Sequence, residues 1–293
     1  MIITRPSRPV DAIHRARGEF RKAAIRRQLQ SVAAGKTDHI PADAAEPSHD
    51  AASTINEISK GLREDSLPLQ LLQVAFKNSQ VADRAIENLA VKNIHDRVAG
   101  ARLVGSLRLY EATPWLVPLL FAKDPSVADA GARALGRIGG ASSASALVAA
   151  IQRRGQNRRR ISELARSAPD LFLESAIDGS DRPVTRPALA IAAGLRRRRT
   201  AISPLLKLLE RGSRKERVIS CRALGWIGAA NAIPAIEELL TDHDWKLRMS
   251  AAKALGALHA KSSVQALQGL ASDRNPRVRK AGTQALRLIQ HGA

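Results

Sequence analysis

The segment Ala223-Leu-Gly-Trp-Ile-Gly recurs 31 residues later as Ala254-Leu-Gly-Ala-Leu-His, and after another 31 as Ala285-Leu-Arg-Leu-Ile-Gln. Leu103 and Ala134 are separated by the same distance, and one unit between residues 134 and 161 is four residues shorter. A fixed period of this size is typical of helical repeat arrays, in which each unit buries its apolar face by stacking on its neighbours. The spacing therefore predicts about seven repeats.

Each repeat has the sequence signals of two helices. Asp124-Pro begins one helix, with Asp as the cap and Pro in the first turn, and Val127, Leu135 and Ile138 give it an apolar stripe at helical spacing. Gly139-Gly140 ends this helix, and a second one follows. Aromatic residues are only 3% of the 293 residues, and no segment has the ~18 consecutive apolar residues of a membrane-spanning helix. We therefore predict an all-α protein, an α-solenoid of helical hairpins with a basic N-terminal helical arm.

This pattern resembles HEAT repeats, of the short Ala-rich type also found in phycobilin lyases. The matching features are the Asp-Pro or Asn-Pro helix starts, the Ala-Leu-Gly motif and one row of basic residues, over residues 93–293. The resemblance implies that rows of Asp and Arg tie adjacent repeats together. The basic row consists of Arg102, Arg133, Arg160, Arg222 and Lys253.

The composition predicts four parts of the chain. Residues 1–36 form a basic amphipathic arm with Ile13, Phe20, Leu29 and Val32 in its apolar stripe. Residues 37–52 form a polar linker, residues 53–92 a degenerate helical cap, and residues 93–293 the repeat array. The arm resembles the juxtamembrane stretch of bacterial membrane-anchored HEAT proteins, although this sequence lacks their transmembrane helix. With a single cysteine and no signal peptide, the chain is expected to be cytoplasmic, or peripheral to the inner face of the membrane.

The net charge of +20 is concentrated in two places. Residues 1–36 contain nine basic and two acidic residues, and residues 151–217 contain 17 basic and seven acidic ones. In the arm, the residues predicted to face a membrane surface are Arg15, Arg17, Arg21, Lys22, Arg26 and Arg27. In the array, the residues predicted to bind an anion or a partner are Arg153, Arg154, Arg158, Arg159, Arg160, Arg196, Arg197, Arg198, Arg199, Arg214, Lys215 and Arg217.

The charge alone is compatible with several roles. In the array it fits a solvated surface, a phosphate-bearing partner or an acidic protein. The arm fits contact with anionic lipid or a disordered basic tail. Nucleic acid and an anionic membrane are therefore retained as alternative partners beside a protein.

Enzyme motifs are missing from the sequence. None of the seven histidines precedes Glu, whereas deoxyhypusine hydroxylase, which resembles this fold, uses His-Glu pairs to hold two irons. Trp115 and Cys221 align with Ala in other repeats, so both are predicted to be buried. We predict a non-enzymatic scaffold that binds a protein, without cofactor, metal or evident small-molecule substrate. Nucleic-acid binding is the main alternative, and a lyase-like or accessory enzyme role is a weaker one.

Overall fold

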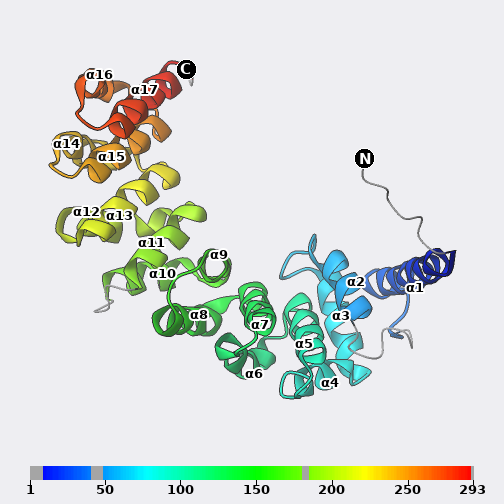
Figure 1. Ribbon diagram of the computed structural model, residues 1–293. Coiled ribbons are helices and arrows are strands. Elements are labelled where there is room, and N and C mark those ends of the chain that lie inside the picture. Colours follow the sequence, from blue (N-terminus) through cyan, green and yellow to red (C-terminus); the bar gives the residue numbers. More distant parts are fainter. Residues whose placement is uncertain (1–8, 41–48, 180–184, 292–293) are drawn as a thin grey trace. The chain divides into compact units, whose positions relative to one another are not determined.

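The computed structural model describes residues 9–40, 49–179 and 185–291, together with the side chains of most of them. These residues form helices joined by turns, without strands, which confirms the predicted all-α class (Figure 1). None of the described helices is long and apolar enough to span a membrane. The chain divides into two compact units, Met1–Ile138 and Gly139–Ala293.

The N-terminal unit begins with one long helix and continues as shorter ones. Its elements are α1 Pro9–Ala33, α2 His49–Ser59, α3 Leu67–Asn78, α4 Val81–Glu87, α5 Ile94–Ser106, η2 Tyr110–Ala112, α6 Thr113–Leu116, η3 Pro118–Phe121 and α7 Pro125–Ile138.

The second half of α1 packs against α2 and α3, so it is part of the folded unit. Ile25, Leu29 and Val32 are at most 1% exposed. Phe20, predicted to belong to the same apolar stripe, is 78% exposed, and Ile25 lies in the core instead. The side chain of Ile13 lies outside the described residues. The buried face therefore includes Leu29 and Val32, as predicted, but has Ile25 in place of Phe20.

The C-terminal unit consists of helix pairs in two rows. The first-helix row contains α9 Arg158–Ser167, α11 Arg186–Leu195, α13 Arg214–Ile227, α15 Trp245–Ala257 and α17 Pro276–His291. The second-helix row contains α10 Asp170–Asp178, α12 Ile202–Arg211, α14 Ile233–Glu238 and α16 Val264–Gly269. The other elements are α8 Gly140–Arg154, η4 Arg199–Ala201, η5 Ala230–Ala232, η6 Leu239–Thr241, η7 Lys261–Ser263 and η8 Leu270–Ser272.

Figure 1 shows α11, α13, α15 and α17 in succession, with α12, α14 and α16 beside them. The Ala-Leu-Gly motif explains how closely these first helices approach one another. A Cβ added to Gly225 would lie 2.9 Å from the Ala254 Cα, and one added to Gly256 would lie 2.8 Å from the Ala285 Cα. At these positions only glycine fits against the alanine of the next helix. The same contacts explain the low aromatic content, since aromatic side chains would separate the helices.

Polar caps at the repeat starts fix where the first helices begin. The Asp124 and Asp244 carboxylates and the Asn93 and Asn275 amides accept hydrogen bonds from backbone N–H groups two residues later, at 2.8–3.0 Å. These residues satisfy donors that have no partner within the helix. The helix starts predicted from the Asp and Asn positions are thereby confirmed.

Candidate functional site

A row of arginines in the fourth helical position links neighbouring repeats. Arg217 donates to the Leu209 carbonyl (3.0 Å) and pairs with Asp242 (3.2 Å) in the next loop. Arg248 binds Asp273 at 2.7 Å and also donates to the Asp242 and His243 carbonyls. Arg279 donates to the Asp273 carbonyl at 2.7 Å. These guanidinium groups therefore join the end of one repeat to the start of the next.

The carboxylates of this ladder are held in the charged form. A hydrogen bond from Arg214 lowers the pKa of Asp244 to about 2, against the opposing effect of burial. A hydrogen bond from Arg248 likewise lowers the pKa of Asp273. Burial would raise the pKa of Glu216, but hydrogen bonds from Ser213 and the charge of Arg186 bring it below its ordinary value. These acids are structural, because their charge is already matched within the protein.

The predicted basic row makes different contacts. Arg133 lies 3.8 Å from Asp129 in its own helix, Arg222 stacks on Trp226, and Arg160 donates to the Gly155 carbonyl. Arg102 is half-buried and Lys253 is exposed. The ladder residues Arg217, Arg248 and Arg279 share the 31-residue period, and Arg186, which pairs with Glu216, lies one period before Arg217. That spacing is the signal in the sequence that could have identified them.

The residues predicted to bind a partner lie in three separate places. Arg153 and Arg154 end α8, and Arg158, Arg159 and Arg160 begin α9. Arg196, Arg197, Arg198 and Arg199 occupy the turn after α11, and Arg214, Lys215 and Arg217 begin α13. They do not form one cluster. Several also have structural partners: Arg198 pairs with Asp170 (2.6 Å), Arg214 with Asp244, and Arg217 with Asp242.

The residues predicted to contact a membrane are only partly described. The side chains of Arg15, Arg17 and Arg21 lie outside the described residues. Lys22 lies 3.5 Å from Asp50, Arg26 pairs with Glu57, and Arg27 is exposed. Two of the three described cations are therefore engaged with α2.

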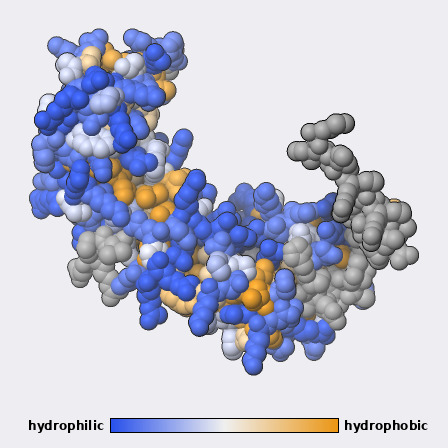
Figure 2. Space-filling model, in the orientation of Figure 1, coloured by the Kyte–Doolittle hydropathy of each residue, from blue (hydrophilic) through white to orange (hydrophobic). Residues whose placement is uncertain are grey.

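The exposed face of the first-helix row has charge of one sign. Its five helices contain only two acidic residues, Glu163 and Glu216, and these are 4% and 3% exposed. The exposed cations recur at the repeat spacing, with Lys215, Lys246 and Arg277 in one column and Arg222 and Lys253 in another. We call this surface the cationic face. Figure 2 shows a hydrophobic area near α11 among the hydrophilic residues that surround it.

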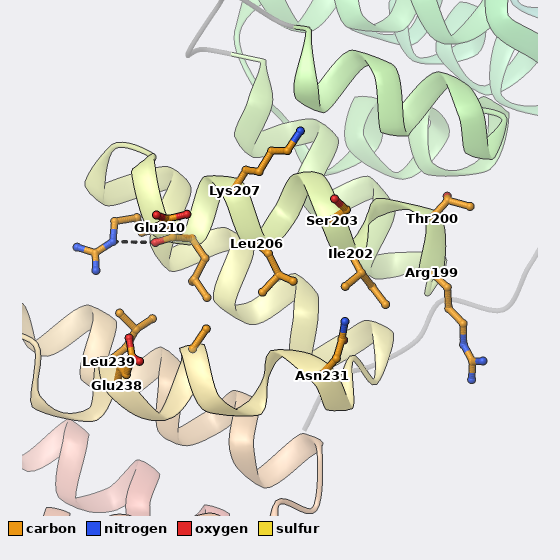
Figure 3. Close-up of a pocket in the computed structure, with 13 residues that line it drawn as sticks. Arg199, Thr200, Ile202, Ser203, Leu206, Lys207, Glu210, Asn231, Glu238 and Leu239 are labelled. Carbon is orange, nitrogen blue, oxygen red and sulfur yellow. Dashed lines mark hydrogen bonds between the residues drawn. The ribbon is translucent and has the colours of Figure 1, made fainter.

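The second-helix row has charges of both signs. Its helices contain six acidic residues: Asp170, Glu174, Asp178, Glu210, Glu237 and Glu238. Between α12 and α14 lies a groove of about 1010 Å³, lined by Lys207, Glu210 and Glu238 around Leu206 and Ile202 (Figure 3). A second groove, of about 920 Å³, follows between α14 and α16. These grooves balance cations with carboxylates.

Cys221 and Trp115 test two predictions of burial. Cys221 is fully buried, as predicted, and burial raises the pKa of its thiol to about 12. Trp115 is 55% exposed, so the prediction that it lies in the core is wrong. The equivalent Ala235 and Ala266 are only half-buried, although the residue after each of them is buried, so a Trp at this boundary position extends into solvent. Among the described residues, no three His, Cys, Asp or Glu side chains are grouped as metal ligands.

The chain was compared with known proteins in sequence and in structure. No curated protein matches the chain in sequence. Human deoxyhypusine hydroxylase in complex with glycerol is 18% identical over 92% of this chain and 98% of its own, with a TM-score of 0.37. A designed armadillo repeat protein is 18% identical over 70% of this chain and 98% of its own (TM-score 0.38). Kap121p bound to Nup53p is 15% identical over 86% of this chain and 34% of its own (TM-score 0.44).

The family itself is shown by the sequence. A family model of HEAT repeats matches residues 69–165 and 202–287, which together make up more than half of the chain. The matched segments contain the Ala-Leu-Gly contacts and the Arg217 and Arg248 ladder described above. The chain belongs to the HEAT-repeat family.

Proposed function

We propose that this protein is a non-enzymatic scaffold that binds an acidic protein partner through the cationic face of its C-terminal unit. The observation that carries the proposal is the segregation of charge between the two helix rows. Exposed cations recur on α13, α15 and α17, while the only two acids of the first-helix row are buried. A surface of one sign attracts a partner of the opposite sign and increases the rate of association.

The ladder strengthens this assignment, because it separates structural arginines from available cations. Arg214, Arg217 and Arg248 are neutralised by Asp244, Asp242 and Asp273. Lys215, Lys246 and Lys253 are exposed on the same helices. A partner with carboxylates would therefore meet cations that the fold does not need.

Nucleic acid is the second candidate, because a phosphate backbone would also be attracted to columns of cations without carboxylates. Counterion release predicts a steep dependence of that affinity on salt, with a slope of about −0.9 per neutralised phosphate on a double-logarithmic plot. Salt dependence and competition therefore distinguish the two partners.

The proposal is tested by fluorescence anisotropy with a labelled glutamate-rich peptide and a labelled DNA duplex, at low and at moderate salt. The triple variant Lys215→Glu, Arg222→Glu, Lys253→Glu should lose peptide binding by at least tenfold. The control variant Arg211→Glu, Lys261→Glu, Arg274→Glu changes the net charge equally but on the second-helix row and adjoining loops. It should lose less than threefold.

Two results would overturn the proposal. Equal losses in the two triple variants would show that only the net charge matters. Binding of DNA but not of the peptide, with a steep salt slope that the first triple variant flattens, would establish the nucleic-acid candidate instead.

A further inference from the structure

We infer that the cationic face contains a docking groove for an acidic segment in polyproline II conformation with an apolar side chain at every third residue. This inference rests on the proposed function and specifies the partner of the same surface. It follows from the exposed apolar side chains of the face, from a hollow beside one of them, and from the spacing of the helices.

Exposed apolar side chains form a column along the cationic face. Four large apolar residues of the described C-terminal unit are highly exposed: Leu171, Leu195, Trp226 and Leu288. The last three are 53%, 37% and 50% exposed, and multiples of 31 residues separate them. The fourth repeat position in this column is the exposed Ala257. We call these four positions the apolar column. Exposed apolar residues that are grouped in this way indicate a binding surface, whereas single exposed apolar residues do not.

A hollow next to Trp226 offers room for a partner side chain. It has a volume of about 370 Å³ and is lined by Leu195, Arg197, Trp226 and Ala257, with the buried Gly194 and Gly225 at its base. A Cβ added to Gly194 would lie 2.8 Å from the Trp226 ring and 3.0 Å from the Ala223 Cα, so glycine is needed there for the contact between α11 and α13. Ala257 leaves space where the neighbouring repeats have Trp or Leu. The hollow therefore suits a large apolar side chain from another molecule.

The spacing of the column selects the conformation of the segment. Closely packed helices lie about 8–10 Å apart, so successive members of the column are separated by about that distance. In polyproline II, every third residue lies on the same face and three residues advance about 9 Å. In a β-strand, residues on the same face are about 7 Å apart. Their side chains would therefore no longer match the apolar column after one repeat.

The charges around the column call for acidic residues between the apolar ones. Arg222 stacks over the Trp226 ring at 5.2 Å, and Arg197, Lys253 and Arg287 are exposed nearby in the same repeats. A segment alternating apolar residues with carboxylates satisfies both the column and its cations. A nucleic acid would satisfy the cations but would leave Leu195 and Leu288 without apolar partners.

The turn that contains Arg197 places its side chain at the hollow. Its φ is 51°, a left-handed conformation that disfavours any residue with a Cβ. The equivalent turn position in the next repeat is Gly228, at φ 82°. The Arg197 side chain lines the hollow and makes no hydrogen bond or ion pair with the described residues. Arg108 and His259 have the same backbone conformation at the equivalent turn, so this conformation belongs to the repeat, and Arg197 contributes to the groove through its side chain.

The test uses three fluorescein-labelled peptides of twelve residues, built from four copies of Leu-Pro-Glu, Ser-Pro-Glu or Leu-Pro-Lys. Proline favours polyproline II in all three. The Leu-Pro-Glu peptide should bind the full chain at least tenfold more tightly than the Ser-Pro-Glu peptide, and the Leu-Pro-Lys peptide should not bind. Replacing Leu195, Trp226 or Leu288 by Ser should remove the preference for leucine. Leu171→Ser, at a still more exposed position on α10, should keep it.

The outcomes separate this inference from the proposed function. Salt-sensitive binding of both acidic peptides with equal affinity would overturn the apolar groove and leave the acidic partner standing. Absence of binding by either acidic peptide, together with a glutamate-rich peptide that also fails to bind, would overturn the proposed function itself. Tighter binding of an acidic helical peptide with leucine at every seventh residue would overturn the polyproline II conformation. Circular dichroism of each variant checks that it remains folded.

Discussion

Arg248 and Asp273 form a buried pair that joins two consecutive repeats. The Arg248 Nε lies 2.7 Å from one carboxylate oxygen and its Nη2 lies 3.0 Å from the other, and the two side chains are 7% and 8% exposed. The same guanidinium group donates to two carbonyls of the preceding loop. Each of the three guanidinium nitrogens therefore donates either to the loop before α15 or to the loop before α17.

Removing this arginine should destabilise the C-terminal unit severely. Arg248→Ala leaves the Asp273 carboxylate and two loop carbonyls buried without their donor, at a cost of about 3–5 kcal/mol. The matched variant Arg274→Ala removes an exposed cation one residue from Asp273 and should change stability by less than about 0.5 kcal/mol. Urea unfolding followed by circular dichroism measures both. Equal midpoints for the two variants would contradict the ladder.

The pairing of Asp244 predicts a loss of stability in acid. Its pKa in the folded chain is about 2, below the ordinary value of 3.8, so the carboxylate stabilises the fold above pH 3.8. This contribution, about 1–2 kcal/mol, disappears as the pH falls through about 2. Asp244→Asn should therefore be less stable than the original chain at pH 7, because the amide can still cap α15 but cannot pair with Arg214. The difference should shrink at pH 2.5, which urea unfolding at both pH values would show.

Two glycine-to-alanine substitutions should change the stability of the fold in opposite directions. Gly225→Ala places a Cβ 2.9 Å from the Ala254 Cα and should push α13 and α15 apart, at a cost of about 1–3 kcal/mol. Gly269→Ala meets no atom within 4 Å and should stabilise α16 by about 0.5–1 kcal/mol. Thermal unfolding compares the two. If Gly225→Ala were as stable as Gly269→Ala, the close approach of the first helices would be disproved.

Replacing Arg197 by glycine should raise the stability of the fold and weaken peptide binding. Arg197→Gly removes an unfavourable backbone conformation worth about 1–2 kcal/mol, without losing a described side-chain contact. The variant should melt at a higher temperature and bind the Leu-Pro-Glu peptide more weakly. His259→Gly, at the same turn position two repeats later, should gain less stability because His259 Nδ1 contacts the Leu288 carbonyl at 3.0 Å. An Arg197→Gly variant with unchanged peptide affinity would argue against a role of this side chain in the groove.

The thiol of Cys221 should be unreactive in the folded protein. Burial raises its pKa to about 12, so the thiolate that reacts with disulfide reagents is nearly absent at pH 8. Ellman's reagent should label the chain only after unfolding in guanidinium chloride. Rapid labelling of the native protein would show that α13 opens locally.

The sequence predicted the repeats well because their signals are local. Capping residues such as Asp124, and the glycines of the Ala-Leu-Gly motif, act within one turn of helix or at one contact between neighbouring repeats. The roles of the cations were harder to predict, because they depend on which direction a helix faces. Arg222 and Arg217 lie on the same helix, yet one is exposed over Trp226 and the other reaches Asp242 in the next loop.

The arm and Trp115 show the same limit. Helical periodicity identifies an apolar stripe in α1 but cannot decide between Phe20 and Ile25, because the answer depends on where α2 and α3 pack. Trp115 aligns with alanines in other repeats, but those alanines lie at the edge of the core, where a small side chain is half-buried and a large one is exposed. In both cases tertiary packing determines burial.

The contacts between repeats also have a consequence for how such an array can grow. Arg217 pairs with Asp242 25 residues later, Arg248 pairs with Asp273 at the same separation, and each glycine contacts an alanine 29 residues later. The residues that form each junction therefore lie within one repeat length of each other in the sequence. A tandem copy of residues 214–244 would carry the same contact residues, so it would fit the repeat on either side of it. Lengthening the protein in this way would extend the cationic face and its apolar column by one repeat. Duplication of one repeat would thus allow the array to bind a longer partner segment.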